Sequence, residues 1–377
     1  MTRRFSALLV LLLLAVGFVV WYRAQGSGDH TPIVRPNLVV ITGGSSPYWQ
    51  SIGNGARAAA KDLNVTVDVR MPKQDEDVDA QWQLLLGIDP EKIDGAAISP
   101  LDADLQTRAI NELAGDTLVV TIDSDAPLSN RLSYVGASNV AAGRQCANLV
   151  REAVPGGGKI VVLLANLTKS NTLERKEGFE ETLTQISPGQ IEPVPNIEVV
   201  EYLVDEGDNA RCEQQLRNLL AAHGDLVCLV GMNAYHGPIL LKVLRDEGRL
   251  GKMKLVTFDT VDETLAGIEA GEIYATVAQD PYEYGYEAVR LLSSYCRRWD
   301  QRNLPPPGVK STMTINTNAV RKDNIDEFRR NFSGRAEDNT DGSKSSSAKK
   351  QAETQQSQAL QPMDRLRTIA SAYPPRL

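Results

Sequence analysis

Short apolar runs alternate with segments of helical periodicity from residue 37 onward. The first runs are NLVVIT, VTVDVRM, DGAAIS and LVVTID, and the later ones are LSYVGAS, KIVVLLAN, EVVEYLV, LVCLVG, KLVTFD and IYATVAQ. Continuous apolar runs bounded by turn residues are typical of strands buried on both faces, and their alternation with helices predicts parallel sheets. Roughly eleven strands exceed one compact doubly wound sheet. We therefore predict an α/β fold with two doubly wound parallel-sheet lobes. No sequence repeat relates the two halves, so this pairing follows from element order alone.

The two ends of the chain differ from this pattern. Arg3 and Arg4 precede an apolar run over residues 5–22, and a Gly/Ser-rich stretch follows it. This arrangement predicts an export segment within residues 1–35, either a cleaved signal peptide or a retained membrane anchor. No cysteine follows the run closely enough for lipid attachment. Residues 333–377 are rich in Ser, Lys, Gln, Asp and Glu, which predicts a disordered tail, with a helix near 363–370 as the alternative.

Composition excludes several classes of function. The net charge of −8 comes with no dense Lys/Arg stripe in the central region, so no nucleic-acid partner is expected. The four cysteines form no CxxC pair and the three histidines lie far apart, so no metal or cofactor is predicted. Cys228, inside the run LVCLV, is expected to be a buried thiol rather than half of a disulfide.

An enzyme is not expected either. The glycine clusters at residues 43–44 and 156–158 give neither GxGxxG nor a Walker pattern. Asp123 and Asp259 could form a hydrolase pair, but no hydrolase motif surrounds them.

Polar residues that end the apolar runs are the candidates for a binding site, because ligands of open parallel sheets bind beyond the carboxyl ends of the strands. They comprise carboxylates, amides, hydroxyls and an aromatic pair, and they occur at residues 42–49, Asp123, Ser124, Asn166, Asn233, Asp259 and Gln279. Carboxylates and amides bond to hydroxyl groups, while aromatic faces cover the C–H surface of a ring. The mixture indicates a sugar.

Six segments stand in a telling order: NLVVITGGSSPYWQSIGNGARAAA, VVTIDSDAP, YVGASNVAAGRQ, ERKEGF, VGMNA and LVTFDTVDETLAGIEAGEIYATVAQDPYEYG. Together they resemble the ribose-binding-protein family of type I periplasmic sugar-binding proteins of ABC transporters, over about residues 37–328. The resemblance implies two lobes joined by a three-strand hinge, with crossovers near 136–139, 279–282 and 306–311. The first lobe would comprise residues 36–137 and 280–307, and the second 138–279 and 308–332.

The resemblance also implies a set of ligand-binding residues. They are Ser46, Tyr48, Trp49, Asp123 and Ser124 on the first lobe, and Arg175, Asn233, Asp259 and Gln279 on the second or beside the hinge. Ser124 stands where pentose-binding members carry Arg, which argues against ribose itself. Each residue also has a purely structural interpretation, such as a strand-end turn for the two aspartates or a lobe-core position for Tyr48 and Trp49.

We therefore expect a monomeric, periplasmic or otherwise extracytoplasmic protein that binds a monosaccharide without catalysis and delivers it to the permease of an ABC importer. The alternative is a membrane-tethered sugar sensor or adaptor, anchored to the inner membrane by residues 5–22. A sugar-responsive repressor would carry a helix-turn-helix before the first lobe, whereas this chain has the apolar run there.

Overall fold

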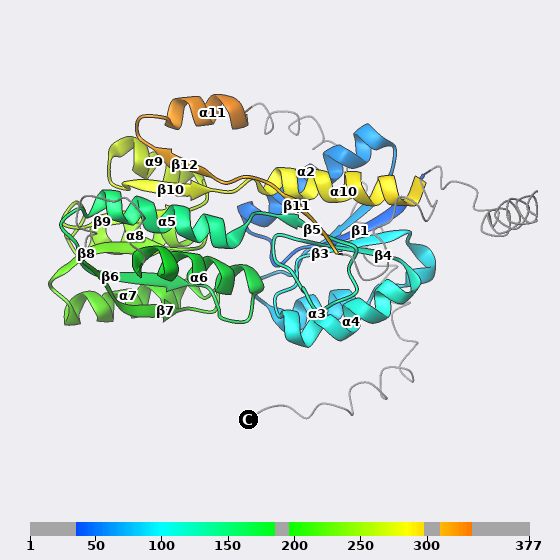
Figure 1. Cartoon of the computed structure of the whole chain (residues 1–377), viewed down its shortest axis with the longest axis horizontal. Coiled ribbons are helices and arrows are strands. Elements are labelled where there is room, and N and C mark those ends of the chain that lie inside the picture. Colours follow the sequence, from blue (N-terminus) through cyan, green and yellow to red (C-terminus); the bar gives the residue numbers. More distant parts are fainter. Residues whose placement is uncertain (1–34, 185–195, 298–309, 334–377) are drawn as a thin grey trace, which may run out of the picture. The chain divides into compact units, whose positions relative to one another are not determined.

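The computed structural model describes residues 35–184, 196–297 and 310–333, and two six-stranded sheets form its framework (Figure 1). In the first lobe the strands lie in the order β11 (Ser311–Thr314), β5 (Ser133–Gly136), β4 (Leu118–Ile122), β3 (Gly95–Ile98), β1 (Asn37–Ile41) and β2 (Thr66–Arg70). The helical elements of this lobe are α2 (Pro47–Leu63), α3 (Val78–Leu86), η1 (Pro90–Lys92), α4 (Ala103–Asp116) and α10 (Pro281–Arg297). All pairings in this sheet are parallel.

The second lobe repeats this plan. Its strands lie in the order β12 (Asn318–Arg321), β10 (Ala275–Ala278), β9 (Lys254–Phe258), β8 (Leu226–Gly231), β6 (Gly158–Leu164) and β7 (Ile197–Val204). Its helices are α5 (Asn139–Ala153), α6 (Ser170–Thr184), α7 (Asn209–Ala222), α8 (His236–Asp246) and α9 (Asp262–Ala270). Only β12 runs antiparallel to its neighbour in this sheet. The predicted fold class is confirmed.

Burial on both faces of the sheet explains the apolar runs. In β1, Leu38 and Val40 pack with α2 and α10, whereas Val39 and Ile41 pack on the opposite face with α3 and α4. Residues 38–41 of this strand are all buried, so they show no polar alternation. The four cysteines are likewise buried and free of disulfides, and Cys228 is a buried thiol as predicted.

The chain passes between the sheets three times, from β5 to α5, from β10 to α10 and from β11 to β12. The third crossover lies between Thr314 and Asn318, so its expected place at residues 306–311 is wrong, and so is the assignment of all of 308–332 to the second lobe. β11 pairs with β5 along its whole length, and Arg131 donates a hydrogen bond to the Ser311 carbonyl. The proline-rich stretch at residues 305–307 suggested the wrong place for the crossover. The strand that follows this stretch, β11, pairs with the edge of β5 and so still belongs to the first lobe.

One pair of helices in each lobe packs unusually closely through glycine. A Cβ atom on Gly55 of α2 would lie 1.9 Å from the Tyr282 carbonyl oxygen, and one on Gly285 of α10 would lie 1.9 Å from that of Ile52. In the second lobe, a Cβ on Gly143 of α5 would lie 2.0 Å from the Arg175 carbonyl oxygen. Backbone meets backbone at these points, so larger residues would force the helices apart.

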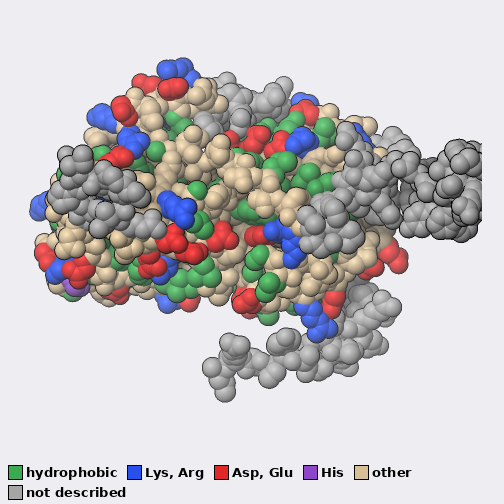
Figure 2. All heavy atoms as spheres, viewed as in Figure 1, with side chains coloured by type: hydrophobic (Ala, Val, Ile, Leu, Met, Phe, Trp, Pro, Cys, Tyr) green, Lys and Arg blue, Asp and Glu red, His purple; other side chains and the backbone are tan. Residues whose placement is uncertain are grey.

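The remaining described helix, α11 (Ile325–Ser333), belongs from residue 326 onward to a unit separate from the two lobes. Across the three described ranges, no helix is long and apolar enough to cross a membrane. The expected export segment at 5–22 and nearly all of the expected tail lie outside those ranges. Basic and acidic side chains are interspersed over the face shown in Figure 2, in keeping with the absence of a basic stripe from the central sequence.

Candidate functional site

A cavity of about 310 Å³ collects residues from both lobes. Most of its walls are formed by loops and helix starts that follow strand ends. The residues that line it are Ser46, Pro47, Tyr48, Trp49, Asp75, Glu76, Asp123, Lys169, Asn171, Arg175, Asn209, Asn233, Ala234, Tyr235, Pro238, Ile239, Asp259, Val261, Glu263 and Gln279. Its volume lies at the lower end of the range for ligand sites, which suits a small molecule.

The first-lobe wall is built around Tyr48 and Asp123. Asp123 directly follows β4 and adopts a left-handed backbone conformation with φ of 60°. The Tyr48 hydroxyl donates a 2.6 Å hydrogen bond to one Asp123 oxygen. Burial, followed by the charge of Asp123, raises the pKa of Tyr48 well above its ordinary value, so the phenol remains a neutral donor.

The second oxygen of Asp123 accepts hydrogen bonds from the Ser99 hydroxyl and from the Asn171 amide, each at 3.2 Å. Asn171 belongs to α6 of the second lobe, so this bond joins the lobes. Asp123 is therefore both part of the wall and a point at which the lobes are connected.

Position and burial differ for the other first-lobe candidates. Trp49 lines the cavity but is only 3% exposed, and its ring meets that of Tyr48 edge to face with centroids 5.2 Å apart. Ser46 lies just before α2, where its hydroxyl makes no capping bond. Asp75 instead accepts hydrogen bonds from the backbone amides of Ser45 and Ser46, at 2.8 and 3.0 Å. The helix start is thus held by a loop that follows β2.

The second-lobe wall is centred on Arg175, a buried residue of α6 that is 3% exposed. Its guanidinium donates to the Met232 carbonyl at 2.6 Å, to Asn139 Oδ1 at 3.0 Å and to Gln279 Oε1 at 3.3 Å. It also lies over the Phe258 ring, 4.4 Å from the centroid. Its buried Nε–H has no hydrogen-bond partner among the described residues, so that donor remains for a ligand.

Asp259 and Gln279 continue this wall. Asp259 follows β9 with φ of 63°, and it accepts a 3.0 Å hydrogen bond from the Gln279 amide. Burial raises the pKa of the Asp259 carboxyl from 3.8 to about 6, although Arg175 and Gln279 both act to lower it. The group is therefore a carboxylate at neutral pH, but burial disfavours its charge, so any additional hydrogen-bond donor would stabilise it.

Asn233 completes the second-lobe wall. Its side-chain oxygen accepts a 3.0 Å hydrogen bond from the Ala165 amide, which follows β6. Asn233 itself follows β8, so the bond fastens two neighbouring strand ends together.

A buried ion pair joins the lobes beside the cavity. Lys169 Nζ lies 3.0 Å from Glu76 Oε1, and the two side chains are 3% and 6% exposed. The other Glu76 oxygen accepts a hydrogen bond from the Asn166 amide, and Lys169 also lies 5.1 Å from the Trp49 ring centroid. Burial raises the pKa of Glu76, and the charge of Lys169 opposes that rise. We refer to Glu76, Asn166 and Lys169 as the interlobe clasp.

Eight of the nine expected residues line the cavity, and the exception is Ser124. Ser124 is fully buried, and its hydroxyl lies 3.3 Å from that of Ser170. Its expected place in the cavity lining is therefore not found, whereas the neighbouring Asp123 does line the cavity.

Sequence reasoning missed other lining residues, notably Asp75, Glu76, Lys169, Asn171 and Tyr235. The strand-end rule had already selected Asn166 after β6, and extending it along that stretch and to the polar stretch after β2 could have found the first four.

Comparisons with known proteins identify the family of the chain. The family described as periplasmic binding protein domain matches residues 37–298. The D-allose-binding periplasmic protein of Escherichia coli is 22% identical over 263 residues, which cover 67% of this chain and 82% of that protein. The ribose import binding protein of Salmonella typhimurium is 24% identical over 257 residues, with coverage of 67% and 82%.

Two solved structures resemble the chain over most of its length. One is an ABC transporter solute-binding protein from Burkholderia graminis in complex with D-arabinose, with a TM-score of 0.70, 26% identity and coverage of 78% of this chain and 98% of that one. The other is a glucose-galactose binding protein from Geobacillus stearothermophilus, with a TM-score of 0.69, 27% identity and coverage of 77% and 98%.

Proposed function

Because the chain belongs to the periplasmic binding protein family, we propose that it is an extracytoplasmic protein that encloses a neutral monosaccharide between its lobes. One observation carries the proposal: a single cavity of about 310 Å³ takes Asp123 and Tyr48 from one lobe and Asp259 and Arg175 from the other. Carboxylates accept hydrogen bonds from hydroxyl groups and the guanidinium donates to ring or hydroxyl oxygens. A polyol placed there would bond to both lobes at once.

The charges of the cavity favour a neutral ligand over an acidic one. Lys169 is paired with Glu76, and Arg175 already donates to three acceptors within the chain. A carboxylate or phosphate would therefore meet the charges of Asp123 and Asp259 with only the charge of Arg175 to offset them. Relatives named for D-allose and ribose, and a similar structure in complex with D-arabinose, support a neutral sugar.

The proposal includes no catalytic step. The described residues that line the cavity include no histidine and no cysteine, so a Ser–His or Cys–His pair cannot form there. The proposal includes delivery to the permease of an ABC importer, and it is supported by one relative named as an import binding protein and by a similar structure named as an ABC transporter solute-binding protein. The apolar run at 5–22 would carry the chain across the membrane.

That same run favours a second candidate, a membrane-tethered sugar sensor or adaptor. Determining the mature N-terminus by mass spectrometry separates the two: loss of residues 5–22 favours a released carrier, and their retention favours the tethered form.

Calorimetry of the full chain with D-allose, D-ribose, D-arabinose, D-galactose and D-glucose tests the binding function. We expect at least one sugar to bind, and D-galacturonate not to bind. Asp123→Asn and Arg175→Ala should each weaken binding by about ten- to a hundredfold, because a hydrogen bond to a charged group contributes about 1.5 to 3 kcal/mol.

Arg144→Ala is the matched control, since Arg144 is 53% exposed and pairs with Glu181 outside the cavity. It should bind like the parent. If both Asp123→Asn and Arg175→Ala retain the parent affinity, the cavity is not the binding site.

A further inference from the structure

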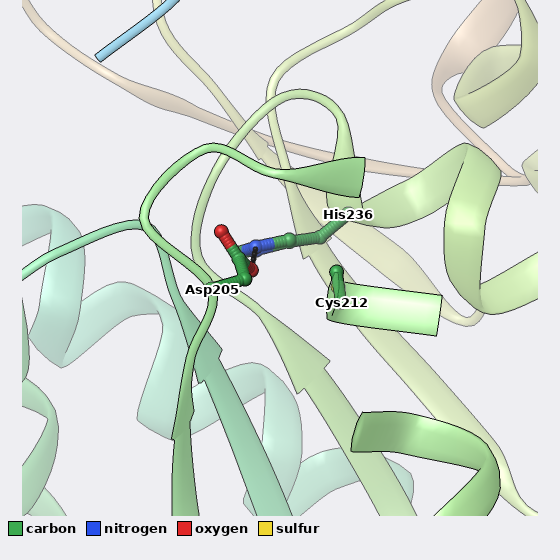
Figure 3. Close-up of side chains that lie close together, drawn as sticks. All are labelled: Asp205, Cys212 and His236. Atoms are coloured by element: carbon green, nitrogen blue, oxygen red, sulfur yellow. Dashed lines mark hydrogen bonds and ion pairs between the residues drawn. The ribbon is translucent and has the colours of Figure 1, made fainter. Parts of the chain in front are cut away.

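Three buried side chains in the second lobe lie close together: Asp205, Cys212 and His236 (Figure 3). Asp205 follows β7, Cys212 lies in α7, and His236 is the first residue of α8. His236 Nε2 lies 2.9 Å from Asp205 Oδ2, and both side chains are fully buried. None of the three lines the cavity, so the proposed function does not account for them.

The backbone determines which imidazole nitrogen carries the proton. The Asn233 backbone N–H donates a 3.1 Å hydrogen bond to His236 Nδ1. A backbone amide can only donate, so Nδ1 must be the acceptor and Nε2 must carry the proton. Nε2 then donates to Asp205, and both nitrogens of the ring are occupied.

Asp205 is held as firmly as the imidazole. Its other oxygen accepts hydrogen bonds from the Tyr235 hydroxyl and from the Gly207 amide, the latter at 2.9 Å. Tyr235 also lines the cavity. Burial and the nearby Asp205 raise the pKa of the Cys212 thiol, so the thiol stays protonated beside the carboxylate. The carboxylate is therefore satisfied by donors alone.

This network ends on a residue of the ligand wall. His236 holds the Asn233 backbone, and the Ala165 amide holds its side-chain oxygen. Asn233 lines the cavity, and its Nδ2 group is a hydrogen-bond donor that can bind a ligand there. We infer that His236, oriented by Asp205, is a positioning residue that fixes Asn233 for ligand binding. The inference rests on the proposed function.

A metal site is the competing interpretation, because carboxylate, thiolate and imidazole are all metal ligands. A metal bound to His236 would have to displace either the Asn233 amide or Asp205 from the ring. The two interpretations therefore differ in the protonation and occupancy of the imidazole.

Nitrogen NMR of the ¹⁵N-labelled full chain without sugar tests the tautomer directly. The chain has three histidines, and loss of a signal in His223→Gln or His236→Gln assigns the spectrum. We expect His236 to be protonated at Nε2 only. Protonation at Nδ1, or a spectrum that changes when EDTA is added, would overturn the inference.

Asp205→Asn tests whether the carboxylate sets this tautomer. Whichever way the new amide is turned, its NH₂ group faces either His236 Nε2–H or the Gly207 amide. We expect the histidine to lose its single tautomer, with a shift of the Asn233 amide resonance. An unchanged histidine spectrum would show that Asp205 does not orient the ring.

Two substitutions at position 236 separate positioning from general stability. The oxygen of His236→Asn can replace Nδ1 as acceptor for Asn233, whereas the amide of His236→Gln can replace Nε2 as donor to Asp205. Both variants should melt earlier than the parent. Only His236→Gln should bind D-allose, D-ribose or D-arabinose more weakly, by about five- to tenfold, which is the effect of one neutral hydrogen bond.

His223→Gln is the control, because His223 ends α7 and does not line the cavity. It should match the parent. If His236→Asn binds no better than His236→Gln, the positioning role is overturned. If the parent itself binds none of these sugars, the proposed function has failed, and the NMR result alone decides whether the network holds Asn233.

Discussion

The two lobes use the same close helix contact but assemble it differently. In the second lobe α5 and α6 are consecutive helices, and Gly143 and Gly178 each lie against backbone of the other helix. In the first lobe the partners are α2 and α10, which are far apart in the sequence but lie side by side in Figure 1. In the sequence, α10 of the first lobe therefore comes only after nearly all elements of the second lobe. Its core has the higher contact order, which slows folding.

The two walls of the cavity show a second likeness and a second difference. Asp123 and Asp259 both follow a central strand with a left-handed backbone. Asp123 receives its short hydrogen bond from a phenol, and Asp259 receives one from an amide. Burial raises the pKa of Asp259 to about 6. The same backbone position thus carries a hydrogen-bond acceptor held by a phenol in the first lobe and a carboxyl with a raised pKa in the second.

The largest effect is expected from adding a methyl group at the helix contacts. Gly55→Ala and Gly143→Ala each place a Cβ about 2 Å from a backbone carbonyl oxygen, which cannot move aside as a side chain can. We expect each variant to lose at least about 3 kcal/mol of unfolding free energy. Thermal and urea denaturation measure the loss in both lobes.

Gly115→Ala in α4 is the control, since nothing lies within 4 Å of its added Cβ. It should leave stability unchanged or raise it by roughly 0.5 to 1 kcal/mol, because alanine favours helix. Parent-like melting of Gly143→Ala would show that the helices of the second lobe are not held at this distance.

The raised pKa of Asp259 predicts that this residue makes stability depend on pH. A carboxyl with an unfolded pKa near 3.8 and a folded pKa of about 6 binds its proton more tightly in the native state. Its contribution to stability therefore falls as pH rises from about 4 to 6, by up to about 3 kcal/mol.

Asp259→Asn removes this dependence. In urea unfolding at pH 4.5, 5.5, 6.5 and 7.5, the unfolding free energy of the variant should rise relative to that of the parent as pH rises to about 6. The difference should then stay constant at higher pH. A difference between Asp259→Asn and the parent that is constant from pH 4.5 upward would contradict the assignment.

The smallest effect is expected where the two lobes meet. Glu76→Gln leaves the Lys169 ammonium buried without a countercharge when the lobes are closed, but not when water reaches it. We expect about tenfold weaker sugar binding and less ligand-induced compaction in small-angle scattering, because the variant shifts the balance toward the open form.

Glu181→Gln removes one partner of an exposed ion pair with Arg144 and serves as the control. It should change neither affinity nor compaction. Equal behaviour of the two variants would mean that the clasp does not favour closure.

The sequence predicted what depends on local pattern. The run NLVVI has no polar face because β1 is buried on both sides, and that alone identifies it as a central strand. Asp123 and Asp259 follow strands, so the strand-end rule places them at the cavity.

Features that depend on contacts between segments far apart in the sequence could not be predicted from it. Gly55 and Gly143 look like weak points inside helices until the neighbouring backbone is seen. The partners of the interlobe clasp belong to different lobes, and nothing local in the sequence links Glu76 to Lys169. Likewise, only the open edge of β5 shows why the third crossover follows β11.

The interlobe clasp also affects how long a ligand stays enclosed between the lobes. Before the lobes separate, water must reach both Glu76 and Lys169, since neither charge is stable alone in a dry interface. The dwell time of an enclosed molecule is then governed by how quickly this pair is hydrated, whereas the choice of molecule is governed by Asp123, Asp259 and their partners. Substitutions at residues 76 and 169 can therefore lengthen or shorten the time for which a ligand stays enclosed.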